Sequence, residues 1–365
     1  MLEILDIEAL RTLGLNLSLL PQLAGLESAP DERLWRVTEV QRDRLNLQAP
    51  HAACRARLLP ALQQRLFAAG EQLAVGDWVL ARTDAAGATW VGQRLTPLNL
   101  LSRRDPEGQR QALVSNVDTA LLVMGLDHDF KLARLDRYLV LTRAAGVATV
   151  IVLSKADLCR DVEARLADVE DHLAHSRRHD GGAISVLAVD GTQAEATRAR
   201  LAPWLGRGQT LVLLGSSGAG KSTLTNALCG ATLQSTGAVR EDDSRGRHTT
   251  TVRTLHRTPD GACIIDTPGL RGLQLDASSA ELDAAFDDVA TLARACRFRN
   301  CSHNEEPGCA VRAALAPARL KSYQKLQREA RREDMGLLER RAQLQQWKAR
   351  SRAAHAHIRS KRNEA

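Results

Sequence analysis

Gly215-Ser-Ser-Gly-Ala-Gly-Lys-Ser222 is the stretch of this sequence that decides the fold. It follows an apolar run at residues 209–214 and precedes the helical pattern STLTNALC. A Gly-x4-Gly-Lys-Ser pattern between a strand and a helix is typical of a phosphate-binding loop (P-loop), whose backbone N–H groups surround a β-phosphate. We therefore predict a nucleotide site that includes nine consecutive residues: Gly215, Ser216, Ser217, Gly218, Ala219, Gly220, Lys221, Ser222 and Thr223.

The end of this pattern carries its chemistry. Lys221 is expected to place its ammonium against the β- and γ-phosphates and to take part in catalysis, while the Ser222 hydroxyl binds Mg²⁺. The N-terminus of the following helix adds a partial positive charge. A glycine-rich turn without a ligand is the alternative, but the strand before it and the helix after it favour a P-loop nucleotide hydrolase.

Two later segments are expected to complete the phosphate site. Asp266-Thr-Pro-Gly269 closes an apolar run, so Asp266 can hold Mg²⁺ through a water and the Gly269 N–H can contact the γ-phosphate. The loop RGRHTTTV lies between this motif and the P-loop. One of its threonines is expected to complete the Mg²⁺ shell. We assign Thr250, with its two neighbours and a simple Ser/Thr-rich turn left open.

The base-reading motif is expected at Ser154-Lys-Ala-Asp157, which ends the apolar run 147–153. In GTPases an Asn/Thr-Lys-x-Asp motif reads guanine, because the Asp accepts from guanine N1–H and the 2-amino group. Ser154, Lys155, Ala156 and Asp157 are thus predicted to bind GTP or GDP. Two departures bear on selectivity: Ser154 is shorter than Asn and is expected to hold the loop and the base less firmly, and Leu187-Ala188 stands where a Ser-Ala clamp is usual.

The order of these motifs is informative. The base-reading motif precedes the P-loop here, whereas it follows the P-loop in ordinary GTPases. The same sheet can be built from a chain that is opened elsewhere, so the order predicts a circularly permuted α/β GTPase domain. Apolar strands alternating with helices from about residue 112 support a doubly wound sheet buried on both faces.

The remaining chain suggests further domains, because 365 residues exceed one ordinary domain. Short segments of alternating polarity, separated by turn formers, predict a small all-β barrel. Polar residues 103–111 are expected to form a linker. The predicted parts are a short helical or loosely packed extension (1–33), the barrel (34–104), the GTPase domain (112–275), a mostly helical zinc-binding domain (276–325) and a basic helical tail (326–365).

Cysteine usage points to a metal site. Cys296-x4-Cys301-x-His303-x5-Cys309 supplies three thiolates and an imidazole within fourteen residues. That set is complete for tetrahedral Zn²⁺ and leaves no open position, so we predict one structural zinc ion. Free cysteines beside an exposed histidine are the alternative.

Charge and hydropathy indicate a cytoplasmic protein that binds a polyanion. There is no run of about 18 apolar residues and no secretory pattern at the N-terminus, so we expect neither a membrane partner nor export. From Lys321 to the end there are 13 Lys and Arg against 5 Asp and Glu, and this region carries the whole excess of the +7 net charge. Nucleic acid is the first candidate partner, and a solvated charged helix is the alternative.

These marks together resemble the RsgA (YjeQ) family of circularly permuted GTPases that act in small-ribosomal-subunit assembly. The resemblance rests on SKAD before GSSGAGKST, on GRHTTT, DTPG and CRFRNCSHNEEPGC, and covers roughly residues 34–330. It implies an OB barrel, a permuted GTPase domain and a zinc domain. It also implies GTP hydrolysis stimulated by the 30S subunit, with contacts to 16S rRNA. We expect a monomer.

The resemblance also suggests a catalytic residue. Leu270 follows Gly269, and an apolar side chain there cannot orient the attacking water, so His248 in the switch loop becomes the candidate. That His248 contacts RNA or only orders the loop stays open. For the whole chain, the alternatives are an RNA- or ribosome-binding module with weak hydrolysis and a P-loop ATPase or kinase. The second is disfavoured because Asp157 fits guanine.

Overall fold

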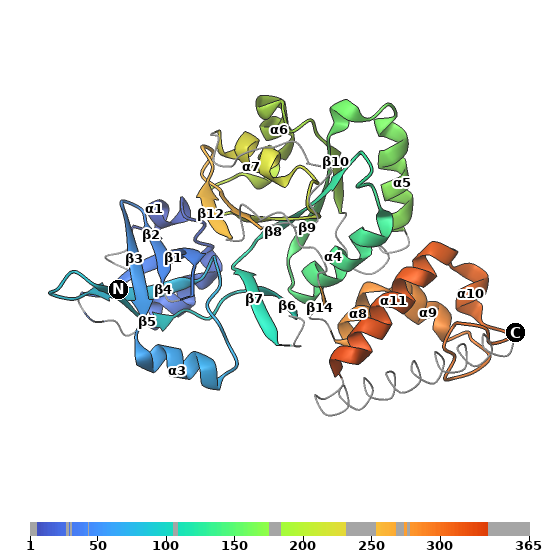
Figure 1. Ribbon diagram of the computed structural model, residues 1–365, viewed down its shortest axis with the longest axis horizontal. Coiled ribbons are helices and arrows are strands. Elements are labelled where there is room, and N and C mark those ends of the chain that lie inside the picture. The colour runs from blue at the N-terminus through green and yellow to red at the C-terminus, as the bar shows by residue number, and fades with distance from the viewer. Residues whose placement is uncertain are drawn as a thin grey trace, which may run out of the picture.

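A computed structural model describes residues 6–26, 29, 31–42, 44–104, 109–174, 184–230, 253–267, 274–275 and 278–334. Figure 1 shows a blue barrel at one end, a central sheet between helices, and a group of orange and red helices at the other end. Thr250, His248, Gly269 and the predicted tail beyond residue 334 lie outside the described residues. No helix in the described part of the chain is long and apolar enough to cross a membrane.

The first part is the predicted closed barrel, with strands in the order β1-β2-β3-β5-β4. Its inner face is lined by the apolar residues of alternating strand positions, such as Val37, Leu47, Val79 and Val91, all buried. The helix of this part, α3, covers the core with Leu62 and Leu66. The elements are β1 (Arg33–Val40), β2 (Leu45–Ala49), β3 (Ala52–Leu58), α3 (Pro60–Ala68), β4 (Trp78–Thr83) and β5 (Thr89–Arg94).

The segment before the barrel is helical and well packed. It contains α1 (Ile7–Arg11) and α2 (Leu20–Ala24), joined through a short 3-10 turn. Five of its leucines are buried against Trp78 and neighbouring barrel residues. Of the two states expected for this extension, helical is therefore right and loosely packed is wrong. The spacing of the leucines predicts a helix. Their burial is explained by the apolar outer face of the barrel, against which they pack.

The central domain is a six-stranded sheet with the order β10-β9-β8-β11-β13-β12, in which only β12 is antiparallel to its neighbour. Successive residues of β8 point to opposite faces: Leu122 and Met124 pack with α4 and α5, and Leu121 and Val123 with α6 and α7. The strands are β8 (Thr119–Gly125), β9 (Ala148–Ser154), β10 (Ser185–Ala188), β11 (Thr210–Leu214), β12 (Thr254–Arg257) and β13 (Cys263–Asp266). The helices are α4 (Leu132–Ala144), α5 (Val162–Ala174), α6 (Ala194–Leu201) and α7 (Lys221–Cys229).

A small three-stranded sheet stands between the barrel and the C-terminal helices (Figure 1). It consists of β6 (Leu100–Arg104), β7 (Arg110–Ser115) and β14 (Gln274–Leu275) in the order β14-β6-β7. The described ends of the polar stretch expected to be a linker belong to it, because Arg103 pairs with Gln111 and Arg104 with Arg110. That expectation was wrong, since polar residues also occur on strands that are only partly covered.

The last part is helical and shares one core with the central domain. It contains α8 (Ser279–Ala285), α9 (Asp287–Ala293), α10 (Ala310–Ala314) and α11 (Pro317–Asp334). Ser278 and Glu281 form a capping box that fixes the start of α8. Phe286 and Tyr323 belong to the same buried cluster as Leu139 of α4, and their rings lie 5.3 Å apart. The C-terminal helices are thus packed on the α4 side of the sheet.

Candidate nucleotide and metal sites

The P-loop connects β11 to α7 at the carboxyl edge of the sheet. β11 is buried along its whole length, and the loop turns sharply at two glycines with positive φ, Gly218 at 82° and Gly220 at 85°. A side chain at Gly215 is excluded as well, because its Cβ would lie 2.4 Å from the carbonyl oxygen of Val123. The strand, turn and helix expected from the sequence are all present, so the loop has the backbone shape that a phosphate cradle requires.

Lys221, the first residue of α7, lies over this loop. Its Nζ donates hydrogen bonds to the carbonyl oxygens of Gly215, at 3.0 Å, and Ser216, at 2.6 Å. Burial lowers the pKa of Lys221 to about 8, opposed by the nearby carboxylates of Asp266 and Asp129. A bound phosphate would add negative charge beside this ammonium and favour its charged form.

The base-reading motif is joined directly to the P-loop. Ser154 ends β9, and its buried hydroxyl donates to the carbonyl oxygen of Ala219 at 2.6 Å. The expectation that serine is too short to hold the loop firmly is therefore not supported by the geometry. The close approach is possible because Gly220 lacks a side chain: a Cβ there would lie 3.1 Å from the Ser154 Oγ.

The rest of this motif turns toward solvent. Lys155 adopts a left-handed backbone with φ 60°, and Asp157 is exposed in the short 3-10 helix Ala156–Leu158. The Ala156 N–H donates to the carbonyl oxygen of Val189 at 3.2 Å, so the loop after β10 lies beside the motif. Ala188, the expected clamp residue, is the last residue of β10 at this same edge. An exposed carboxylate here is available to a base.

Asp266 lies next to the P-loop strand. It is the last residue of β13 and pairs in register with Leu213 of β11. Asp266 is 7% exposed, and its negative charge raises the pKa of Lys221. The neighbouring Thr267 hydroxyl donates to the carbonyl oxygen of Leu213 at 2.6 Å, which fixes the chain as it leaves the strand. Asp266 is thus held close to the start of α7, where Lys221 and Ser222 lie.

Three charged residues at this edge were not found from the sequence. Asp127 and Asp129 follow β8, and Arg134 lies in the first turn of α4. Asp127 pairs with Lys155 Nζ at 2.6 Å, and Asp129 accepts a hydrogen bond from the Ser216 hydroxyl at 2.6 Å. No local pattern marks these residues, but their position could have been inferred. The strand order changes direction between β8 and β11, and ligands of such sheets bind at that point.

The predicted metal ligands come together. The donor atoms of Cys296, Cys301, His303 and Cys309 all lie within 4.8 Å of one another. The His303 Nδ1 is 3.7 Å from the Cys296 Sγ and 3.5 Å from the Cys309 Sγ. A tetrahedral zinc ion with Zn–S near 2.3 Å and Zn–N near 2.0 Å requires separations of about 3.5–3.8 Å between donors. The ligand set and its spacing therefore fit zinc.

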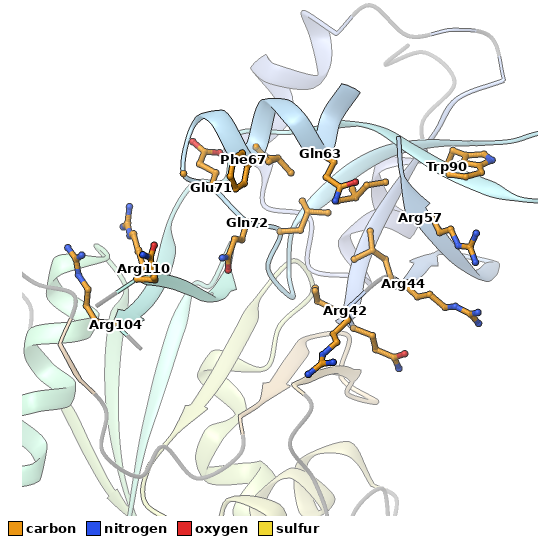
Figure 2. Close-up of a pocket in the computed structure, with 18 residues that line it drawn as sticks. Arg42, Arg44, Arg57, Gln63, Phe67, Glu71, Gln72, Trp90, Arg104 and Arg110 are labelled. Carbon is orange, nitrogen blue, oxygen red and sulfur yellow. The ribbon is translucent and has the colours of Figure 1, made fainter. Parts of the chain in front are cut away.

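A basic groove lies on the barrel, bounded by α3 and by the β6–β7 hairpin. It has a volume of about 1120 Å³. Figure 2 shows Arg42, Arg44 and Arg57 on one side of the groove and Arg104 and Arg110 on the other. Among the lining residues that the structure describes, Glu71 is the one acid, and it is 3.1 Å from Arg94. Such a groove attracts anions.

Aromatic side chains accompany these arginines. Phe67 of α3 is 87% exposed, and the ring of Trp90 also lines the groove. A smaller hollow of about 220 Å³ shares Arg44, Arg57 and Trp90 with the groove and adds Arg55. An exposed ring and a half-buried one among arginines suit single-stranded nucleic acid, because bases stack on rings while phosphates contact cations.

The fold and these sites define a P-loop nucleotide hydrolase with a permuted sheet, a barrel and a cluster of three cysteines and a histidine. Solved structures agree. The crystal structure of YjeQ from Thermotoga maritima has a TM-score of 0.57 and 24% identity, covering 82% of this chain and 98% of that one. YloQ, a circularly permuted GTPase, has a TM-score of 0.55 and 22% identity, covering 84% and 98%. These two show the fold.

Sequence comparison identifies the family. The RsgA GTPase model matches residues 96–276. The small ribosomal subunit biogenesis GTPase RsgA of Xylella fastidiosa strain 9a5c is 46% identical over 287 residues, 77% of this chain and 81% of that protein. The RsgA of Xanthomonas campestris pv. campestris strain B100 is 44% identical over 288 residues, with 77% and 76% covered. The chain belongs to the RsgA family, and it is a GTP-hydrolysing enzyme.

Proposed function

We propose that this GTPase binds the small (30S) ribosomal subunit in the cytoplasm and acts in its late assembly, with hydrolysis stimulated by the subunit. The observation that carries the ribosomal part is the arginine groove on the barrel. Relatives at 44–46% identity that are named small ribosomal subunit biogenesis GTPases support the same partner. We further propose that the protein acts as a monomer.

In this proposal the P-loop, Lys221 and Thr223 bind the phosphates of GTP, and Ser154 to Asp157 read the guanine. Lys221 holds its ammonium against the charge that develops on the transferred phosphoryl group. Ser222, Thr250 and Asp266 would hold Mg²⁺, which screens the phosphates when bound. Gly269 would contact the γ-phosphate and His248 would orient water. The hydrogen bond from Ser154 to the P-loop supports this assignment, since it joins the two halves of the site.

The zinc ligands have a structural role in this proposal. Cys296, Cys301, His303 and Cys309 would hold one Zn²⁺ with no open position for catalysis. The Cys309 Sγ also accepts the Arg312 N–H at 3.4 Å, at the start of α10. The ion would therefore fix the loop onto the helices, and so preserve the surface that the C-terminal part presents to the subunit.

The groove is proposed to receive a single-stranded segment of 16S rRNA. Phosphates would lie along the arginines of its two walls, and a base would stack on Phe67. Each phosphate that an arginine neutralises releases counterions, so the affinity for RNA should fall steeply as the salt concentration rises. Since RNA backbone contacts carry no sequence information, this groove would orient the protein rather than choose the site.

The test is co-sedimentation with purified 30S subunits at several salt concentrations, in a non-hydrolysable GTP analogue. Arg42→Ala together with Arg57→Ala should weaken binding about tenfold and lower the salt slope by about two. The control is Arg33→Ala with Arg82→Ala, two exposed barrel arginines outside the groove. If both double variants lose affinity for the subunit equally, or if neither loses any, the groove is not the docking surface.

A further inference from the structure

The P-loop is held from outside through the hydroxyl of Ser216. The Ser216 Oγ donates to Asp129 Oδ1 at 2.6 Å and accepts from Arg134 Nη1 at 2.7 Å. These partners are 87 and 82 residues away in the sequence. The Ser216 carbonyl oxygen accepts from Lys221. If Lys221 turns to a phosphate, that bond is given up, and the Ser216 hydroxyl contacts remain to hold the loop together with the Ser154 hydrogen bond to Ala219.

Asp129 carries a negative charge close to the proposed phosphate site, where it would repel a phosphate. It is 7% exposed, and its charge raises the pKa of Lys221 against the effect of burial. The Gly125 N–H donates to its Oδ2 at 3.3 Å, which ties it to the end of β8. A carboxylate here repels phosphates unless a cation offsets it. Arg134 is that cation, since it forms an ion pair with the Asp129 carboxylate.

Arg134 lies on the helix that carries the C-terminal part. Asp136 of α4 accepts from the Arg319 guanidinium of α11 at 3.0 Å, and it is buried. The next residue of α4, Arg137, pairs with Glu329 of α11 at 2.7 Å. These contacts fix α4 to α11, so a shift of α11 would move the first turn of α4, where Arg134 contacts the loop.

The other face of α11 reaches the metal cluster. Gln324 Nε2 donates to the carbonyl oxygen of the zinc ligand His303 at 3.0 Å. Bonded contacts therefore run from the cluster through α11 and α4 to the P-loop. A chain of contacts is only a route, and transmission requires that a change at one end alters binding at the other.

We propose that Arg134 is a positioning residue of the nucleotide site, through which α4 transmits the placement of the C-terminal helices to the P-loop. The inference rests on the proposed nucleotide site. It makes the C-terminal domain a regulator of GTP affinity and not only a docking surface. Arg134 acts by holding Ser216 and by offsetting Asp129, so it governs nucleotide binding more than the chemical step.

The first test measures mant-GTP and mant-GDP affinity and steady-state turnover in the full chain. Arg134→Ala should raise both dissociation constants and KM about tenfold, with kcat changed less than about twofold. Arg134→Lys should recover most of the affinity. Asp129→Asn in the Arg134→Ala background should also recover it, which a merely structural role for Arg134 would not produce. Arg198→Ala, which breaks the partly exposed pair between α6 and Asp260, is the control and should have no effect.

The second test addresses transmission. Glu329→Ala should raise the mant-GTP dissociation constant about threefold in the wild-type background and have no added effect with Arg134→Ala. Asp168→Ala, which breaks the exposed pair with Arg165, is the control. If wild-type protein binds no guanine nucleotide, the proposed nucleotide site fails. If it binds and Arg134→Ala binds equally well, or if the Glu329→Ala effect is absent or unchanged in the Arg134→Ala background, the inference is overturned.

Discussion

The central domain is attached to its two neighbours in different ways, although a buried arginine stands at the centre of each contact. At the barrel joint, Arg36 of β1 is fully buried and donates to neutral acceptors. These are the carbonyl oxygens of Gly14 at 3.0 Å and Asn116 at 3.1 Å, and the Thr210 hydroxyl at 3.3 Å. Its guanidinium lies 4.9 Å from the centre of the Trp78 ring.

At the C-terminal joint, Arg319 of α11 donates to carboxylates. It pairs with Asp288 at 2.6 Å and with Asp136 at 3.0 Å, and Asp136 is also 2.8 Å from His172. Its guanidinium stacks 4.6 Å from the centre of the Phe286 ring. The two arginines thus share an aromatic neighbour and differ in the charge of their partners.

Because its acceptors are neutral, the Arg36 contact should depend little on charge. The Arg319 contact should depend strongly on charge, because its acceptors are carboxylates. Burial among neutral groups is a cost for the Arg36 charge, which is why its pKa falls to about 10. Asp118 and Asp77 lie near enough to offset that cost only in part. The Arg319 charge is compensated by two carboxylates, so removing either sign leaves the other buried. Loss of one of these charges should therefore loosen the C-terminal joint, whereas the hydrogen-bond acceptors of Arg36 at the barrel joint carry no charge.

The largest effect should come from breaking the metal cluster beneath the C-terminal joint. Cys309→Ser should abolish zinc binding and remove most of the hydrogen-exchange protection of α10 and α11, because a structural zinc site contributes about 10 kcal/mol to folding. Protection of β1, a strand of the barrel, should not change. Cys54→Ser, a barrel cysteine outside the cluster, is the matched control. Loss of protection in the barrel as well would mean that the two joints are not independent.

The next effect is expected from Arg319→Met. Methionine keeps much of the apolar stem but leaves Asp136 and Asp288 as buried carboxylates without their cation. We expect a loss of about 3 kcal/mol in the free energy of opening α11, measured by native-state hydrogen exchange. A variant that also carries Asp136→Asn should recover part of this loss. Equal destabilisation with and without that second change would argue against an electrostatic joint.

The smallest effect is expected from Arg36→Met at the barrel joint. The substitution loses hydrogen bonds to neutral acceptors but also removes the cost of a buried charge, so we expect about 1 kcal/mol. Urea unfolding followed by the fluorescence of Trp78 and the other barrel tryptophans measures it. Arg33→Ala, on the same strand and exposed, should stay within about 0.5 kcal/mol of wild type. If Arg36→Met costs more than Arg319→Met, the distinction between the joints is wrong.

Features set by short-range patterns could be predicted from the sequence. The P-loop, the SKAD motif and the cysteine cluster each place their chemistry within a few residues, and strand or helix periodicity supplied their surroundings. The motif order predicted the permuted sheet, because strand neighbours in an α/β fold follow from where each motif must lie. Ser154 shows the limit of this reasoning. Its identity suggested a weaker loop contact, and the absence of a side chain at Gly220 made the contact close.

The features that were missed depend on distant pairings. Arg36, Asp129 and Arg134 have no local signature, and each acquires its role from partners many tens of residues away. The β6–β7 hairpin was missed because its polar residues resemble a linker. Sequence position alone cannot tell a solvated arginine from one that meets a loop or a carbonyl in the fold. Only the packing of the sheet and helices makes that distinction.

The measurement that tests the account most directly is GTP turnover by the full chain with and without purified 30S subunits, with ATP as the control nucleotide. We expect slow intrinsic GTP hydrolysis, at least tenfold stimulation by the subunit, and little turnover of ATP in either condition. The groove variant Arg42→Ala with Arg57→Ala should need more subunit to reach the same rate. GTP turnover that is indifferent to 30S subunits would contradict the proposed partner, and equal turnover of ATP would contradict guanine reading by Ser154 to Asp157.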